Sequence, residues 1–243
     1  MSFDLDKHLA EEHNMNPFST YLKEIVYGGN DGIVTTFAVV AGFAGAQAQL
    51  GGSLPVLTVL LFGFANLFAD GVSMSLGNFL STRAEKDVYR NFKAKELTEI
   101  KHNSKSEKAE SVEILKRKGF NESQAQELVN IYATNESYWL EFMMNQELEL
   151  QNPEKDNPWY MALATFISFV GFGLIPLMPY ILARGNGNLF IYSVLSTVVA
   201  LILLGTLRWR VSKQGLTRSI SETLILGGIA ALVAYFVGTL FRI

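Results

Sequence analysis

The chain has 243 residues, of which 49% are hydrophobic and only 18% charged, and its formal net charge is −3. A soluble globular domain usually has about a quarter of its residues charged, so this composition favours a membrane protein. The negative net charge argues against a nucleic-acid partner. Cysteine is absent, which excludes disulfides and thiolate metal sites.

The N-terminal segment, residues 1–22, is polar and acidic. It lacks the basic start and the apolar stretch of a signal peptide. We therefore expect it to precede the first membrane span without being removed or inserted.

Five stretches are long and apolar enough to cross a bilayer, for which a helix needs about 20 apolar residues. Residues 32–69 carry no charge over 38 positions but are interrupted at GGSLP, Gly51 to Pro55, which predicts two spans joined by a tight turn. Uncharged stretches of 27, 23 and 19 residues follow at 157–183, 185–207 and 223–241. The sequence predicts an all-α integral membrane protein with five transmembrane helices, near 27–49, 54–80, 159–182, 188–208 and 222–241.

The loop charges predict the orientation of these spans. Lysine and arginine are frequent between the second and third spans and before the fifth span, whereas the connection from the third to the fourth has only Arg184. By the positive-inside rule, the N-terminus, the insert and the last connection are cytoplasmic. The expected parts are a cytoplasmic segment 1–22, two spans in 23–82, a cytoplasmic helical metal-binding insert in 83–158, and three spans in 159–243.

Small residues and prolines predict how the spans pack. Ala41 and Gly45 lie one helical turn apart and allow a close helix approach, which we expect at a dimer interface. Pro176 and Pro179 should distort the third span, because proline removes a backbone hydrogen bond from a helix.

The insert holds 15 of the 23 acids and 12 of the 20 bases, and helix caps divide it. The second span should continue as a helix to about KHNSK, residues 101–105. Ser104 with Glu107 and Asn121 with Gln124 have the spacing of capping boxes, and Gly119 suits a helix C-terminus. A last helix is expected over about 135–150.

Carboxylates and thioethers recur at helical spacing in the insert. Within each pair or trio, residues three or four positions apart share a face of their own helix. The sets are Glu96 with Glu99, Glu107 with Glu110, and Met143 and Met144 with Glu147. Carboxylates bind divalent cations and thioether sulfur adds a softer ligand, which together favour a transition metal. The alternative interpretation is a solvated acidic helix surface with Glu107 only capping and with core methionines.

Two acids fall within the apolar stretches. Asp31 lies at the start of the first span, and Asp70 lies inside the second, with Asn66 and Met74 one turn away on either side. Ionisable groups at membrane depth mark ion pathways by default. The alternative is a buried, hydrogen-bonded Asp70 and an interfacial Asp31.

Four segments resemble the vacuolar iron transporter family. They are YGGNDGIVTTFAVVAGFAGA, FADGVSMSLGNFLSTRAE, WLEFMMNQELEL and GFGLIPLMPYIL. They occur in the order of that family, in which two spans precede a Glu-rich helical insert and three spans follow it. The resemblance covers the chain from about Tyr21 onward.

The resemblance implies a homodimer of five-helix protomers that exchanges Fe²⁺ or a related divalent metal such as Mn²⁺ for protons, with no permanent cofactor. It assigns metal binding in the insert to the seven Glu and Met residues named above. It assigns the membrane path to Asp31 and Met74, with Glu24 as a further acid. Asn66 stands where plant members carry Glu, and Asp70 is the candidate substitute.

The leading hypothesis is therefore a transporter that moves metal out of the cytoplasm, across a prokaryotic inner membrane or into a eukaryotic vacuole, and not an enzyme. A second hypothesis is a membrane-anchored metal-binding or sensing protein without transport. A third is a membrane-bound ferroxidase, for which Glu99 and His102 provide a single Glu-x-x-His pair.

Overall fold

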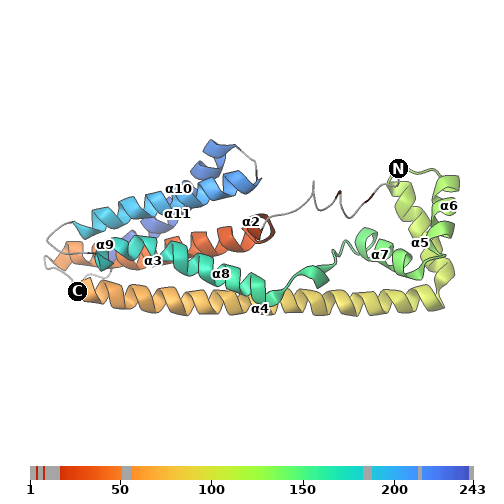
Figure 1. Ribbon diagram of the computed structural model, residues 1–243, viewed down its shortest axis with the longest axis horizontal. Coiled ribbons are helices and arrows are strands. Elements are labelled where there is room, and N and C mark those ends of the chain that lie inside the picture. The colour runs from red at the N-terminus through yellow and green to blue at the C-terminus, as the bar shows by residue number, and fades with distance from the viewer. Residues whose placement is uncertain are drawn as a thin grey trace. The chain divides into compact units, whose positions relative to one another are not determined.

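The structure is a computed structural model that describes residues 4, 8, 17–50, 56–182, 188–212 and 215–240. Within these ranges every regular element is a helix and no strand occurs, as Figure 1 shows. The all-α prediction is confirmed for this part of the chain. The expected turn at 51–55 and most of the N-terminal segment 1–22 lie outside the described residues.

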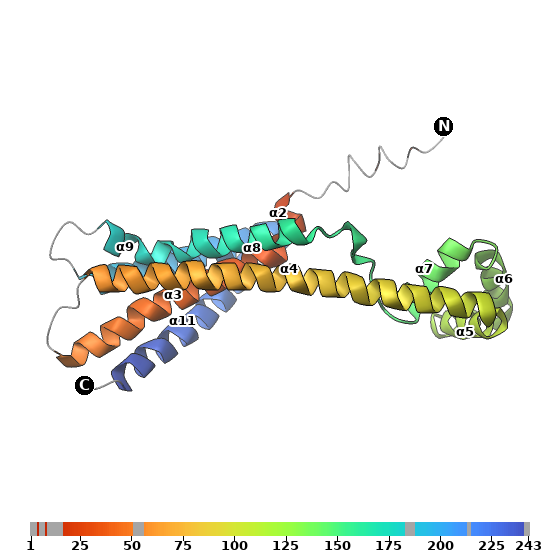
Figure 2. The same cartoon turned by 90° about the horizontal axis from the view of Figure 1, so that it is seen from below.

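The chain divides into two compact units, which we describe separately. The bundle unit comprises Met1–Phe79 and Trp159–Ile243, and the insert unit comprises Leu80–Pro158. Helix α4, Val56–His102, begins in the first and ends in the second, and Figure 2 shows it as one uninterrupted helix. The predicted continuation of the second span into the insert is confirmed.

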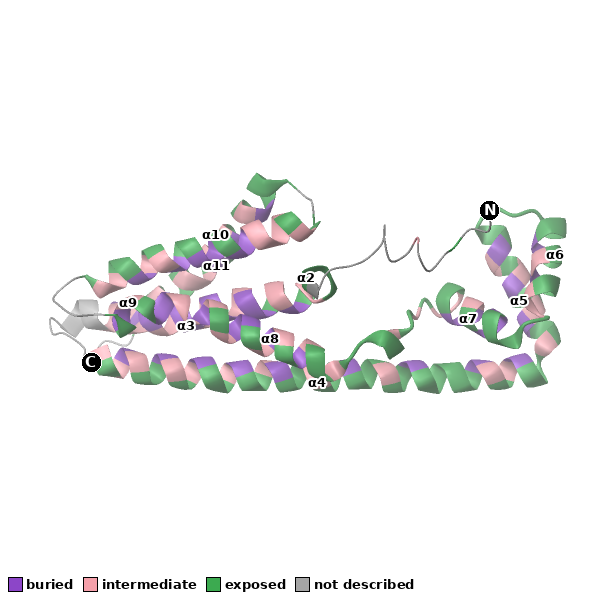
Figure 3. Cartoon of the chain, viewed as in Figure 1, coloured by how far each residue is buried: buried purple, intermediate pink, exposed green. Residues whose placement is uncertain are grey.

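The bundle unit contains the short helix α2, Pro17–Thr20, and four long helical segments besides the start of α4. These are α3 (Leu22–Leu50), α8 (Pro158–Gly173) with its extension through η2 (Ile175–Leu177) and α9 (Met178–Ile181), α10 (Leu189–Ser212) and α11 (Leu216–Leu240). In Figure 3 buried and exposed residues alternate around these helices. Their exposed positions include large apolar side chains such as Leu61, Ile167 and Phe236, as expected for surfaces that face lipid.

Four helical segments of the described chain are long and apolar enough to cross a membrane. They are Val56–His102, Pro158–Ile181, Leu189–Ser212 and Leu216–Leu240. Helix α3 is not among them, and it carries Lys23, Glu24 and Asp31 in its first ten residues. Its membrane crossing therefore stays a prediction.

The last two helices extend beyond their predicted bounds. Helix α10 runs to Ser212, past residue 208, and α11 begins at Leu216, before residue 222. Glu222 pairs with Arg208 at 2.9 Å and with Arg218 at 2.8 Å, and so links the charged parts of the two helices. These ion pairs accommodate charged residues that hydropathy alone places outside a helix.

The third span is interrupted where the prolines predicted it. Helix α8 ends at Gly173, and the 3₁₀ turn η2 and the short helix α9 follow. Pro179 cannot donate the hydrogen bond that the carbonyl of Pro176 would receive in a continuous 3₁₀ turn. The hydroxyl of Ser193 on α10 donates to this carbonyl at 2.7 Å, so the break is satisfied by a neighbouring helix.

Helices α3 and α8 approach each other so closely that glycine is required. A Cβ atom on Gly28 would lie 2.7 Å from the carbonyl oxygen of Thr165, and one on Gly32 would meet the carbonyl of Phe169. The hydroxyl of Ser168 on α8 also donates to the carbonyl of Ile25 at 2.6 Å. The glycines around Asp31 thus fix α3 directly against α8.

The close approach predicted for Ala41 and Gly45 occurs within one chain. A Cβ atom on Gly45 would lie 2.7 Å from the carbonyl oxygen of Tyr235 on α11, and Ala41 is buried. Helix α11 of the same chain therefore covers Gly45, and a dimer interface along the first span stays a prediction.

The insert unit contains the end of α4 and three further helices, α5 (Ser104–Arg117), α6 (Glu122–Tyr132) and α7 (Glu136–Gln146). The Asn121–Gln124 capping box is present, and Gly119 has a positive φ of 103° just after α5. The prediction of a Ser104–Glu107 capping box is wrong. Helix α5 has Asn103 as its N-cap, without a side-chain hydrogen bond, and the carboxylate of Glu107 lies beside other acids instead.

Helix α7 is shorter than predicted. It ends at Gln146, and Glu147 is its C-cap. The amide of Leu148 donates to the carbonyl of Met143, and Glu149 takes a positive φ of 53°. The backbone therefore leaves the helix at Glu147, before the expected end at residue 150.

The segment after α7 is held on α4 by charge. Glu154 lies in the 3₁₀ turn η1, Pro153–Lys155, and its two carboxylate oxygens accept from Arg90 at 2.6 and 3.0 Å. Lys86 donates to the backbone carbonyl of Glu154 at 3.0 Å. A bidentate pair of this kind fixes both position and direction.

Candidate functional site

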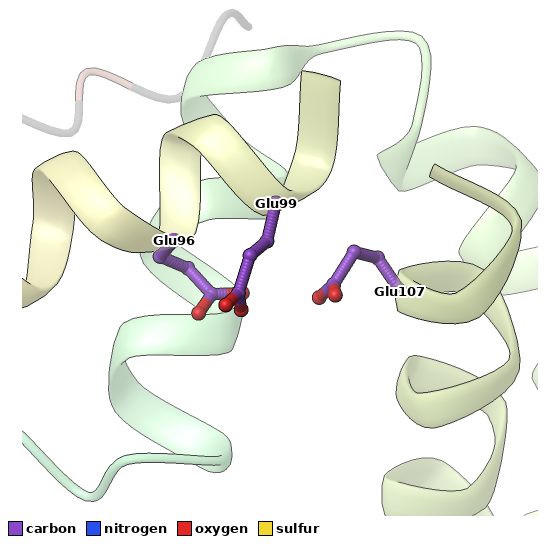
Figure 4. A group of neighbouring side chains, drawn as sticks. All are labelled: Glu96, Glu99 and Glu107. Carbon is purple, nitrogen blue, oxygen red and sulfur yellow. The ribbon is translucent and has the colours of Figure 1, made fainter. Parts of the chain in front are cut away.

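The acids singled out in the insert come together in two overlapping groups. Carboxylate oxygens of Glu96, Glu99 and Glu107 lie within 4.8 Å of one another, and so do those of Glu107, Glu110 and Glu147. Glu96 and Glu99 share one face of α4, and Figure 4 shows them pointing toward Glu107 on α5. Glu107 belongs to both groups, so the predicted convergence of helix faces is present.

Some of these acids are buried and have carboxylate oxygens without a hydrogen-bond partner. Glu96 is 3% exposed and Glu107 is 6% exposed. One buried oxygen of each of Glu96, Glu107 and Glu147 has no hydrogen-bond partner. Unpaired buried carboxylates are strongly unfavourable, and a divalent cation bound by several carboxylate oxygens would satisfy all three atoms.

The electrostatics of the group favour binding a proton or a cation. Burial, together with the nearby Glu147 and Glu107, raises the pKa of Glu96 from 4.5 to about 8. Burial and the nearby Glu110 and Glu107 raise the pKa of Glu147 to about 7. Burial also raises the pKa of Glu107, although the hydrogen bond from Glu96 opposes this. These carboxyl groups can therefore take up protons near neutral pH.

The two methionines predicted as soft ligands are fully buried. Met143 and Met144 are each 0% exposed and pack with Trp139, Leu140 and Tyr89 in the apolar core of the insert. Met143 lies one turn before Glu147 on α7. The structure therefore supports their packing role, and their role as ligands stays a prediction.

The ferroxidase hypothesis gains no support from His102. Its ring is exposed, and its Nδ1 atom lies 2.8 Å from the carbonyl oxygen of Thr98. Neither acid group of the described residues includes it. Glu99 contributes to the first group without the histidine.

The bundle unit holds the acids predicted for the membrane path. Glu24, in the first turn of α3, is 4% exposed, and its Oε2 atom has no hydrogen-bond partner. Asp31, seven residues further along α3, is half-buried, and so is Asp70 on α4.

Asp70 and Asn66 face a pocket of about 640 Å³ whose other lining is apolar. The pocket lies among α3, α4 and α11, and its remaining lining residues are Val39, Gly42, Phe43, Ala46, Phe62, Ala65, Ala69 and Gly238. The buried Nδ2 atom of Asn66 has no hydrogen-bond partner. Met74, one turn beyond Asp70, is half-buried and does not line the pocket.

Sequence reasoning missed two residues beside the acid groups. The hydroxyl of Ser111 lies 3.1 Å from the sulfur of Met143, and the indole of Trp139 donates to this hydroxyl at 2.8 Å. Helical spacing was the available signal. Ser111 follows Glu107 by one turn and Trp139 precedes Met143 by one turn, so both share the faces of the predicted site.

Comparisons with known proteins extend over nearly the whole chain. The model of the VIT family matches residues 22–239. A protein named Vacuolar iron transporter from Toxoplasma gondii is 35% identical over 100% of this chain and 82% of its own length. Vacuolar iron transporter 1 of Oryza sativa is 32% identical, with 95% and 91% coverage, and that of Arabidopsis thaliana is 33% identical, with 93% and 89% coverage. These relatives are named as transporters, and the described helices are those of an integral membrane protein. The chain belongs to the VIT family.

Proposed function

We propose that the chain is a divalent transition-metal transporter that moves Fe²⁺, with Mn²⁺ as a second cargo, out of the cytoplasm in exchange for protons. The relatives are named iron transporters, which supports the metal. The buried acid groups of the insert and the acids of the bundle unit support a cation that competes with protons.

One observation carries this proposal. Three buried carboxylate oxygens, from Glu96, Glu107 and Glu147, lack partners in two acid groups that share Glu107. Such a cluster is unfavourable when all its members are charged. Cation binding or protonation relieves it, so the insert can collect metal from the cytoplasm and release it when protons bind.

The membrane path would run along α3 and α4. A divalent ion cannot cross hydrocarbon without ligands. Asp31, Asp70 and Met74, on the two helices of this path, offer two carboxylates and a thioether. Glu24, with its unpartnered oxygen, would receive the ion at the start of α3. Asn66 lines the same pocket as Asp70 and supplies an amide oxygen.

The arrangement in the membrane follows from the sequence and completes the proposal. Five spans, α3 included, place the N-terminus and the insert in the cytoplasm by the positive-inside rule. The protein would act as a homodimer, since two-fold pairs are the commonest assembly. The relatives are named vacuolar, and the membrane here would be a vacuolar or a prokaryotic inner membrane.

The test is metal flux into proteoliposomes that contain the purified full chain. An inwardly acidic pH gradient should drive uptake of Fe²⁺ and Mn²⁺, uptake should cease when the gradient is collapsed, and Mg²⁺ in excess should compete weakly. The proposal is wrong if the protein binds metal but moves none, because that result identifies an anchored metal-binding protein. Oxygen consumption on addition of Fe²⁺ would instead identify a ferroxidase.

A further inference from the structure

The insert contains a buried polar contact that the acid groups do not explain. Ser111 on α5 is 0% exposed, and so is Met143 on α7. The Ser111 hydroxyl lies 3.1 Å from the Met143 sulfur and 2.8 Å from the carbonyl oxygen of Glu107. The indole of Trp139, which is 1% exposed, donates to the same hydroxyl at 2.8 Å. Water does not reach these atoms, and among the described residues these are the partners of the hydroxyl.

The hydroxyl has one proton and two acceptors for it. Because the Trp139 indole can only donate, the Ser111 oxygen accepts from it and its own proton goes either to the sulfur or to the carbonyl of Glu107. The carbonyl is the stronger acceptor, since thioether sulfur is a weak one. The proton can therefore leave the sulfur and remain hydrogen-bonded.

The contact lies one helical turn from the acid groups on both helices. Ser111 follows Glu107 on α5 by four residues, and Met143 precedes Glu147 on α7 by four, while Glu107 and Glu147 belong to one group of neighbouring carboxylates. Methionine has three rotatable bonds, so its sulfur has no fixed position unless a neighbour provides one. Ser111, fixed by Trp139, is the polar neighbour that the structure gives to this sulfur.

We propose that Ser111 is a positioning residue that holds the thioether of Met143 beside the carboxylates and thereby sets the preference of the insert for soft over hard divalent cations. When a cation takes the sulfur lone pair, the hydroxyl proton turns to the Glu107 carbonyl and no buried group loses its partner. This inference rests on the proposed binding of metal by the insert. It adds to that binding a residue that is not itself a ligand.

The experiment measures the affinities of the full chain in detergent for Cd²⁺, a soft probe, and Mn²⁺, a hard one. Ser111→Ala removes the hydroxyl and should lower the Cd²⁺ affinity about three- to tenfold while leaving that for Mn²⁺ nearly unchanged, in line with the loss of one buried hydrogen bond. Met143→Leu removes the sulfur at similar volume and should likewise lower the ratio of the Cd²⁺ affinity to the Mn²⁺ affinity. Adding Ser111→Ala to Met143→Leu should then have no further effect on the ratio.

A second readout reports on the contact itself. Trp139 becomes the only tryptophan in a Trp159→Phe/Trp209→Phe background, and its emission should change on Cd²⁺ binding with the same midpoint as the calorimetry. Met143→Leu should abolish that change. Ser111→Thr retains a hydroxyl and should keep a Cd²⁺ to Mn²⁺ ratio above that of Ser111→Ala.

The outcomes separate the two proposals. If Ser111→Ala weakens Cd²⁺ and Mn²⁺ equally, or changes their ratio as much in the Met143→Leu background as alone, Ser111 is only a packing residue and the inference is wrong. If the unaltered chain binds neither cation and the Glu107→Gln variant behaves identically, the proposed metal binding by the insert is wrong, and the inference falls with it.

Discussion

Glu96 and Glu107 belong to different helices, yet their carboxylate oxygens lie within 4.8 Å of each other and of Glu99. Each is almost fully buried, and burial raises the pKa of both carboxyl groups. A proton or a cation bound between them would relieve the repulsion of two buried charges. The next three predictions follow from these buried acids.

The first prediction concerns pH. With the pKa of Glu96 at about 8 and that of Glu147 at about 7, both acids are largely protonated at pH 6 and charged at pH 8.5. Metal binding requires the charged form, so the affinity of the full chain for Mn²⁺ should rise steeply between pH 6 and 8.5. Calorimetry in buffers of different ionisation enthalpy should also show protons released on binding. An affinity independent of pH across this window contradicts the assignment of these acids.

The same shifts predict how metal-free stability depends on pH. The unfolded acids lose their protons near 4.5, whereas the folded ones keep them up to about 7 and 8, so the folded state binds more protons in between. Stability then falls as pH rises through this window, by about 1.4 kcal/mol per pH unit for each retained proton. Thermal unfolding with chelator should show a lower Tm at pH 8.5 than at pH 6, and Mn²⁺ should remove the difference.

The second prediction is a substitution that separates stability from binding. Glu107 belongs to both acid groups, so Glu107→Gln should weaken Mn²⁺ binding by about tenfold or more, as expected from the loss of one charged contact. The same change removes a repelling buried charge and should raise the Tm of the metal-free protein at pH 8. The control is Glu113→Gln on the same helix, whose side chain is 53% exposed and which should change neither quantity. Loss of both stability and binding in Glu107→Gln would indicate a purely structural acid.

The third prediction tests the contact between α3 and α8. A Cβ atom at Gly32 would meet the backbone carbonyl of Phe169, and backbone cannot move aside as a flexible side chain does. Gly32→Ala should therefore destabilise the protein by about 1–3 kcal/mol and lower transport, since Asp31 is its neighbour. Gly171→Ala on α8 has no atom within 4 Å of its new carbon and should be neutral or slightly stabilising. Thermal unfolding in detergent distinguishes them, and equal Tm values would contradict the close approach.

The fourth prediction concerns the membrane path. Asp31→Asn should reduce proton-driven flux about tenfold or more, by the loss of one charged ligand, while Mn²⁺ binding by the insert and the Tm stay unchanged. Met74→Leu should lower flux less and shift preference toward Mn²⁺, because it removes a soft ligand at similar volume. The flux assay in proteoliposomes measures both.

Asp70→Asn decides between two versions of this path. Of these two acids, only Asp70 lines the pocket of about 640 Å³ among α3, α4 and α11. If Asp70→Asn abolishes flux and Asp31→Asn does not, the ion follows α4 and the pocket, and the assignment of Asp31 as the central acid is wrong.

The sequence predicted most of the elements because their signals are local. Uncharged runs indicate spans, and Asn121, Gln124 and Gly119 mark the ends of helices by their own backbone chemistry. The failures arose where a distant residue decided. Glu107 has the spacing of a cap for Ser104, but its carboxylate lies beside the acids of α4 instead, and Glu222 pairs with charged residues that hydropathy had placed outside the last two spans.

The sequence identified the acids that lie together but not their geometry. Spacing placed Glu96 and Glu99 on one face and Met143 one turn from Glu147, but it could not show that α5 brings Glu107 to them. It placed Ser111 one turn after Glu107 but could not show the contact between its hydroxyl and the sulfur of Met143. The pocket that Asp70 shares with residues of α3 and α11 depends on how the helices cross, and a single sequence carries no direct record of a crossing.

The C-cap position of Glu147 has a kinetic consequence. Helix ends open locally at a small fraction of the free energy of global unfolding, and beyond Glu147 the backbone is already irregular, with Glu149 at φ 53°. Glu96, Glu99, Glu107 and Glu110, by contrast, stay within continuous helix. Fraying of this one turn would withdraw a single carboxylate and leave the others in place. The ion would then enter and leave through a hinged ligand, and amide hydrogen exchange should be fastest at residues 147–150 without metal and slowed when metal is bound.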